Sequence, residues 1–367
     1  MIIKFYYSKF SRGFSLIELM VAMLIGVLVL AGVIQVVLNS KRSFMDNQET
    51  AFIQDNTRYA MDIIAKDFRA AGYKGCARNE PNIVNVVNSD VAASIEGAFD
   101  FNTKPVSGKE STSKADFKDD KLTFLPANAL PDSITLRTVA NENEATLRSH
   151  NPASKTITTW QTAEYSAGTP LMIVDANCQN IALLLANAAE DEEAASSEAS
   201  TEIKYTNKNC GDGGLISIEE FDCSSGGKTN KVKSLSPGSK IFPYVVNTYF
   251  IGKSNAAINE TMPALKREYL RMEKGVPTYS TEEIAQGVED MQITYGLDED
   301  RNGTVDEDKF IKASEVTAAQ WSRVIAIHIE LTLRSNLPVN AAVGDDGGFL
   351  RKKVASTISL RNLDTSS

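Results

Sequence analysis

The residues whose types and spacing could do chemistry lie in one segment near the C-terminus, DEDRNGTVDEDK, residues 298–309. Its oxygen donors fall at alternating positions: Asp298, Asp300, Asn302, Thr304 through its backbone carbonyl, and Asp306. Gly303 allows the chain to turn sharply between them. Hard oxygen ligands suit Ca²⁺ and argue against a soft metal. The segment therefore predicts a candidate calcium site.

The spacing of these donors follows that of an EF-hand loop except at its last ligand. An EF-hand has a bidentate Glu at the twelfth position, where this chain has Lys309. The flanking sequence also predicts a strand and a loop rather than two helices. We therefore do not expect an EF-hand, and two interpretations remain: a weak calcium loop of another kind, or a solvated turn.

Catalytic patterns are missing from the rest of the sequence. The two histidines, His150 and His328, lie far apart, and no Cys/His spacing fits a zinc site. The stretch SSGGKT, residues 224–229, resembles the end of a phosphate-binding loop, but Asp222 stands where that loop needs its first glycine. We therefore expect no enzyme and no catalytic role for His328.

Four cysteines without a CxxC pair indicate disulfides formed in an oxidising compartment. Three pairings are possible. Cys210–Cys223 would close a short Gly-rich loop and leave Cys76–Cys178, but the sequence alone does not decide between the pairings.

The charge balance is acidic, with 38 Lys and Arg against 47 Asp and Glu and a net charge of −9. Nonspecific binding of a phosphate backbone depends on Lys and Arg. We therefore expect no direct nucleic-acid partner.

The element that begins the chain is an apolar run at residues 14–38, which as a helix spans about 37 Å and exceeds the ~30 Å hydrocarbon core of a membrane. Lys4, Lys9 and Arg12 precede it, so its N-terminus should stay in the cytoplasm. Residues 39–72 continue the pattern as an amphipathic helix without proline, and the glycines at 72 and 75 favour its end. One helix of about 87 Å is expected over residues 14–71.

Residues 73–367 read as a β-rich globular domain, which makes the chain α+β with an antiparallel sheet. The candidate strands start at Leu122, Ile134, Leu171, Tyr244, Met291, Ile325 and Val354. Two polar segments read as loops or insertions: residues 107–120, and the acidic low-complexity segment at residues 186–202, which we expect at the surface.

The N-terminal run carries one carboxylate, Glu18, which is costly in a membrane unless it is paired. Cleavage after Gly13 would free the amine of Phe14, four residues before Glu18. Residues four apart share a helix face, so this amine could neutralise Glu18 within one chain or between neighbouring chains.

The stretch RGFSLIELMVAMLIG, residues 12–26, resembles the type IV prepilin motif. The resemblance implies that a prepilin peptidase cleaves between Gly13 and Phe14, removes the leader of residues 1–13, and methylates the Phe14 amine. Three further stretches resemble PilW-type minor pilins: residues 62–76, residues 287–306 and residues 321–335. The middle of the chain, about residues 85–236, carries no such resemblance.

The resemblance implies a minor pilin that initiates type IV pilus assembly and lies near the pilus tip. Its partners would be other minor pilins, the major pilin and an inner-membrane assembly platform, with inner-membrane lipid around the helix before assembly. The globular domain would be periplasmic, and then at the cell surface. A minor pseudopilin of type II secretion and a membrane-anchored adhesin or binding module are the alternatives.

Overall fold

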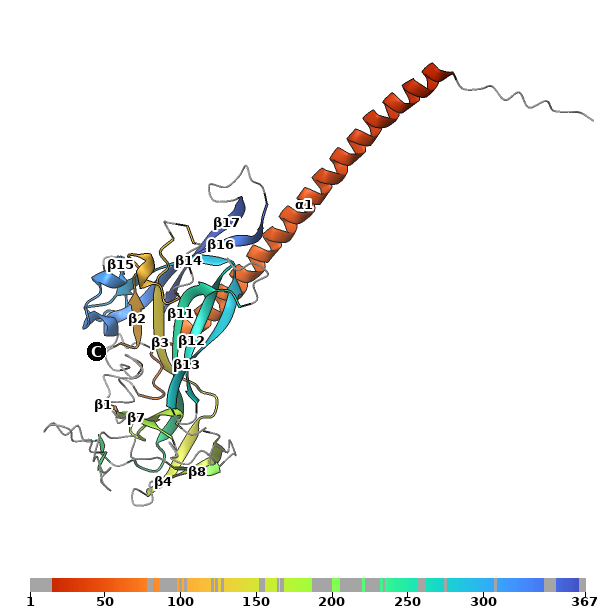
Figure 1. Cartoon of the computed structure of the whole chain (residues 1–367). Coiled ribbons are helices and arrows are strands. Elements are labelled where there is room, and N and C mark those ends of the chain that lie inside the picture. The colour runs from red at the N-terminus through yellow and green to blue at the C-terminus, as the bar shows by residue number, and fades with distance from the viewer. Residues whose placement is uncertain are drawn as a thin grey trace, which may run out of the picture.

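The computed structural model describes residues 15–77, 82–85, 98, 101, 104–119, 122, 125, 126, 129–151, 156–163, 165, 168–186, 200–204, 220, 221, 232, 233, 235–255, 262–273, 276–306, 309–339 and 348–362. A single long helix carries a β-rich body on its C-terminal half, while its N-terminal half projects away from the body (Figure 1). The α+β class predicted from the sequence is confirmed.

Helix α1 runs from Leu16 to Ala70, 55 residues without proline. It ends where Ala71 becomes extended and Gly72 takes a φ of 73°, a left-handed conformation that suits glycine. The Gly72 amide donates to the Arg137 carbonyl at 2.9 Å, so the end of the helix is fixed to the sheet. The predicted continuous helix is confirmed over these residues, and Phe14 lies outside the described residues.

The larger sheet has 11 strands among the described residues, and its longest strand, β11 (Lys240–Lys253), pairs with β3, β4, β6 and β12. The other strands are β1 (Asn82–Asn85), β2 (Val106–Lys109), β3 (Ser133–Val139), β4 (Ala145–Asn151), β5 (Thr156–Ala163), β6 (Pro170–Val174), β7 (Asn180–Leu185), β8 (Ser200–Lys204), β12 (Pro263–Glu273) and β13 (Val276–Gln286). Pairing is antiparallel except between β1 and β7, which run parallel.

The smaller sheet has, in the part of the chain that the structure describes, four antiparallel strands in the order β15, β14, β16, β17. They are β14 (Val288–Leu297), β15 (Phe310–Lys312), β16 (Val324–Pro338) and β17 (Phe349–Ser359). The short 3-10 turns are η1 (Lys114–Asp116), η4 (Ala313–Glu315) and η5 (Gln320–Arg323), and a separate pair of strands is formed by β9 (Glu220–Phe221) and β10 (Val232–Lys233). The alternation expected around residues 325–333 is seen, because Ile327, Ile329 and Leu331 are buried while His328 and Glu330 are not.

The main core lies where α1 meets both sheets. Ile53, Ala60, Ile64 and Phe68 of α1 pack with buried residues of β11, β12, β14 and β16. Phe68 meets Tyr249 of β11 edge to face, with ring centroids 6.4 Å apart. The C-terminal half of α1 therefore joins the two sheets into one body.

Two expectations about local structure are wrong. Leu122 and Leu125 do not lie in a strand. The segment 107–120 is no plain loop, because residues 107–109 belong to β2 and Ser111 is buried against Asp132. The polar composition of residues 107–120 gave no sign that the start of this segment forms a strand by backbone pairing with β3. The acidic segment lies outside the described residues between 187 and 199.

Candidate functional site

The N-terminal half of α1 is an apolar surface without cover. Its large apolar side chains from Leu16 to Leu38 are each at least 50% exposed. The helix is long and apolar enough to cross a membrane, with a mean hydropathy of 2.8 in its most apolar window, and no residue of that window is buried. A surface of this kind marks a site of membrane or protein contact. The structure therefore places the first candidate site on this half helix.

Glu18 lies in the first turn of α1, in a shallow groove with Ser15, Val21 and Ile25. Its own amide donates to the Ser15 carbonyl at 3.0 Å. A carboxylate in the first turn also complements the positive end of the helix dipole. Glu18 is thus presented on the outer surface of the helix, whereas Gly13 and Phe14 lie outside the described residues.

Gly26 and Gly32 leave open space on the same half helix. A Cβ atom added at either position would find no other atom within 4 Å. Small residues on a membrane helix let another helix backbone approach closely. The two glycines, with Ala22, are therefore suited to helix–helix packing.

Three side chains along one side of the C-terminal half of α1, those of Glu49, Asn56 and Asp67, make polar contacts with the body. Glu49, which is buried, accepts from the amides of Asn336 at 2.7 Å and Leu337 at 3.3 Å. About two turns further on, the Asn56 Oδ1 accepts from the Gln286 amide at 3.0 Å.

The third contact is centred on the carboxylate of Asp67. Its Oδ2 accepts from the Tyr249 hydroxyl at 2.6 Å, the Asn247 amide group at 2.9 Å and the Arg267 guanidinium at 3.0 Å. Arg267 also pairs with Glu282 of β13. Burial and the neighbouring Asp67 carboxylate raise the pKa of Tyr249 well above its usual range, so the hydroxyl stays a donor. Together these contacts fix both the rotation and the position of α1 on the body.

A disulfide joins Cys76, six residues beyond the end of α1, to Cys178 in the turn between β6 and β7, with Cα atoms 5.5 Å apart. This was one of the pairings predicted from the sequence. Cys210 and Cys223 lie outside the described residues, so their pairing stays a prediction.

The Asp-rich segment forms a turn between β14 and β15. The carboxylate oxygens of Asp298, Asp300 and Asp306 lie within 4.8 Å of one another. Asp298 is buried, with its two oxygens accepting from the amides of Asn302 and Gly303, both at 2.9 Å. Three carboxylates this close repel one another, and a cation among them would offset that repulsion. The arrangement could hold a metal ion.

The flanks of this turn settle one sequence question. They are the strands β14 and β15 and not two helices, which agrees with the expectation that the loop is not an EF-hand. Of the five predicted ligands, the side chain of Asn302 bonds to Asp300 and Thr304, at 2.8 Å from Asp300 Oδ2. Lys309 lines the same hollow.

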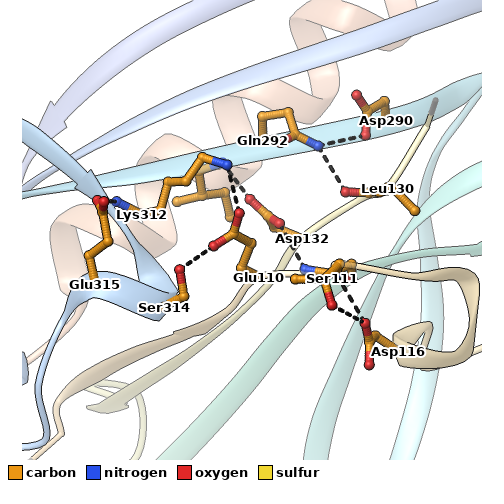
Figure 2. Close-up of polar contacts among 12 residues, drawn as sticks. Glu110, Ser111, Asp116, Leu130, Asp132, Asp290, Gln292, Lys312, Ser314 and Glu315 are labelled. Carbon is orange, nitrogen blue, oxygen red and sulfur yellow. Dashed lines mark hydrogen bonds and ion pairs between the residues drawn. The ribbon is translucent and has the colours of Figure 1, made fainter.

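A polar network that the sequence did not predict connects the two sheets (Figure 2). Asp132, 5% exposed, accepts from the Ser111 amide at 3.2 Å and from the Ile293 amide of β14 at 2.9 Å. Burial raises its pKa to about 6, and the nearby carboxylates of Glu110 and Asp290 add to the shift. Beside it, hydrogen bonds from Lys312 and Ser314 lower the pKa of Glu110.

Close packing accompanies this network. The Tyr295 ring of β14 is fully buried against the Trp321 ring, with centroids 4.9 Å apart. Its hydroxyl comes so close to β2 that a Cβ atom at Gly108 would lie 1.9 Å away. Only glycine fits at this position, so the two sheets meet at a joint built for tight contact.

The comparisons with known proteins agree with this geometry. Residues 248–362 match the family described as type IV pilus-assembly protein W, and residues 8–34 match the prokaryotic N-terminal methylation motif. No curated protein gave a significant match.

A long helix with an exposed apolar half and an early carboxylate, carrying an antiparallel β-body, defines a type IV pilin-like protein. Within that class, the match to pilus-assembly protein W is the more specific of the two. Strands β12 to β17 all lie in the matched region, residues 248–362, and this region matches a PilW-type minor pilin.

Proposed function

We propose that this chain is a minor pilin that promotes the initiation of type IV pilus assembly and stays at or near the pilus tip. The observation that carries the proposal is the exposed apolar half of α1 with Glu18 in its first turn. Such a surface is stable in lipid, and outside lipid it must pack against similar helices. Type IV pilin-like proteins meet both needs.

The proposed mechanism is physical and involves no catalysis by this chain. A prepilin peptidase removes residues 1–13, and the methylated Phe14 amine becomes the new N-terminus beside Glu18. The helix waits in the inner membrane with its body in the periplasm. An inner-membrane assembly platform then moves the helix from lipid to the helices of other minor pilins and the major pilin.

Glu18 gives this transfer its register. A carboxylate among apolar helices is tolerable only where a cation neutralises it, and the Phe14 amine of a neighbouring subunit supplies one. Gly26 and Gly32 then allow close approach of the neighbouring helix.

The Glu18→Ala substitution tests this mechanism in the native host. We expect normal cleavage and methylation, a normal amount of protein, and a loss of surface pili of about tenfold or more. The substitution leaves the Phe14 amine of the neighbouring subunit without its carboxylate, and an unpaired charge costs roughly 2.5–3.5 kcal/mol in a membrane-like interior. Pili are counted by electron microscopy and sheared-pilus immunoblots. Asp46→Ala, an exposed carboxylate on the same helix, is the control. Wild-type piliation of Glu18→Ala would contradict the pairing.

Gene deletion separates the three candidate functions. Loss of pili with intact protein secretion supports the minor pilin, and loss of type II secretion with normal pili would identify a pseudopilin instead. Normal pili and normal secretion, with loss of attachment, would identify an adhesin.

We also propose that Asp298, Asp300 and Asp306 bind Ca²⁺ weakly, in the range of about 10⁻⁴–10⁻³ M found for extracellular modules. The support is the approach of three carboxylates in one turn, one of which is buried. Calcium should raise the Tm of the full chain in detergent, and chelation should reverse the effect. Asp300→Asn should abolish the shift and Asp55→Asn should not; a Tm that is insensitive to calcium would contradict the site.

A further inference from the structure

The outer edge of β17 is the feature that the proposed function leaves unused. Among the residues that the structure describes, strand β17 ends the order of the smaller sheet and pairs on one side, with β16. The register is continuous from Ala326 opposite Ser359 to Arg334 opposite Arg351. A strand with one paired side presents a row of backbone groups on the other.

The register also fixes which backbone groups face outward. The Leu360 amide donates to the Ile325 carbonyl at 2.8 Å, so the even-numbered residues face β16. Hydrogen-bonded pairs alternate with non-hydrogen-bonded pairs along an antiparallel ladder. The N–H and C=O groups of the odd-numbered residues therefore point away from β16; these residues are Arg351, Lys353, Ala355, Thr357 and Ser359.

This edge lacks the usual protection against strand pairing along residues 354–359, VASTIS. The stretch contains no charge, proline or glycine, and Ile358 is its one buried residue. Proteins normally blunt long edges with charges, proline or bulges. An exposed, uncharged edge with β-branched residues is the kind that accepts another strand.

The outer strand of the other sheet, β13, shows what a protected edge looks like in the same molecule. It carries Pro277, the charges of Glu282 and Glu283, and a register shift in its pairing with β12. Its last residue, Gln286, donates its amide to Asn56 of α1. The contrast indicates that the edge of β17 is left open for a partner.

The position of β17 argues against a second copy of this chain as that partner. Its start lies next to the residues that hold Glu49, and just beyond its end the Asn362 side chain donates to the Arg69 carbonyl at 2.9 Å. The strand therefore runs beside α1 in the same direction (Figure 1). Antiparallel pairing of two β17 edges would point their α1 helices in opposite directions, and two such helices could not share one membrane.

We propose that the outer edge of β17 accepts an extended strand from a different subunit of the filament. The incoming strand would be uncharged and β-branched where it faces residues 354–359, with carboxylates near Lys352 and Arg361 at the two ends. The proposal rests on the proposed function, because a subunit that covers the exposed half of α1 also comes alongside β17.

Ala355→Pro tests the edge directly. Proline removes one outward N–H, leaves the ladder to β16 intact and is tolerated on edge strands. Ala355→Thr keeps the N–H and is the matched control. We expect Ala355→Pro to reduce pili by about tenfold or more at an unchanged Tm, since the added strand depends on main-chain hydrogen bonds, and Ala355→Thr to assemble normally. Normal piliation by Ala355→Pro, where gene deletion abolishes pili, would overturn the edge proposal alone.

Hydrogen exchange of the wild-type full chain provides a second test, which needs no substitution and so cannot be affected by misfolding of a variant. The amides of Lys353, Ala355, Thr357 and Ser359 should exchange quickly in the isolated chain in detergent, and slowly in the complex purified with co-expressed minor pilins. The amide of Ser356 should be slow in both. Fast exchange of all four in the complex would overturn the proposal, and so would protection in the isolated chain caused by self-association.

Discussion

The two halves of α1 belong to one helix, yet they differ in what covers them. From Leu16 to Leu38 the large apolar side chains are exposed, whereas from Glu49 to Phe68 one face is buried against both sheets. The exposed half is the more apolar of the two. An apolar side chain in this chain therefore does not always belong to the hydrophobic core of the chain. The exposed apolar side chains on the first half of α1 are suited to contacts with lipid or with other chains.

The largest expected effect comes from truncating the buried face. Phe68→Ala should lower the free energy of unfolding of the body by about 3–5 kcal/mol, because it leaves a cavity against Tyr249. Val29→Ala, on the exposed half, should change it by less than about 0.5 kcal/mol. Urea unfolding followed by the fluorescence of the buried Trp321 measures both. Equal losses of stability in Phe68→Ala and Val29→Ala would contradict the conclusion that only the second half of α1 belongs to the core.

The disulfide beyond the buried half should rank next. Replacing Cys76 and Cys178 together with serine should cost about 2–4 kcal/mol, the typical contribution of a disulfide; the bond closes a long segment, with a sequence separation of 102. Reduction of the wild type should cost at least as much in the same unfolding assay, because it would also break the predicted Cys210–Cys223 bond. A stable double variant would mean that Asp67 and Glu49 suffice to hold the helix.

A smaller effect should appear with pH, and only in the body. Because burial raises the pKa of Asp132 to about 6, its folded state binds a proton more tightly than its unfolded state. Its contribution therefore favours folding at pH 4–5 and is lost as the pH rises through 6. From pH 4 to 7.5, the stability of the wild type relative to Asp132→Asn should fall by about 2 kcal/mol.

Asp116→Asn is the control for this experiment, because hydrogen bonds from Ser113 and Thr112 lower the pKa of Asp116. The difference between wild type and Asp116→Asn should shrink as the pH falls, which is the opposite direction. A difference between wild type and Asp132→Asn that does not change with pH would show that the pKa of Asp132 is the same in the folded and the unfolded state.

The smallest effect should mark the boundary between the two halves. Glu49→Ala removes the acceptor of two backbone amides and should cost about 1 kcal/mol. Asp46→Ala, three residues earlier and exposed, should cost nothing measurable. Comparable losses of stability in Glu49→Ala and Asp46→Ala, measured by urea unfolding, would show that the part of α1 held to the body begins before Glu49.

Local patterns carried most of what the sequence could predict. The continuous helix, six of the seven expected strands and the Cys76–Cys178 pairing were confirmed. Each depends on periodicity, on glycine at a helix end or on a small set of cysteines. The proximity of Asp298, Asp300 and Asp306 was also visible as spacing.

The contacts that hold the body together were not predictable in this way. Asp67 finds Arg267 across 200 positions, and Asp132 finds Ile293 across 161. The sequence placed Gly108 in a polar loop, yet the Tyr295 hydroxyl lies so close to it that a side chain at this position would clash. No local pattern marks a partner at such a distance, because the meeting depends on how two sheets pack.

The disulfide at Cys76 limits how far the body can move when α1 is pulled along its axis. A pull along α1 would shear its buried face past the sheets, and the six residues from Ala70 to Cys76 can stretch by no more than about 20 Å before the covalent bond takes the load. The bond thus limits the separation of α1 from the body. It leaves the non-covalent contacts free to yield and re-form while the body stays attached to its stalk.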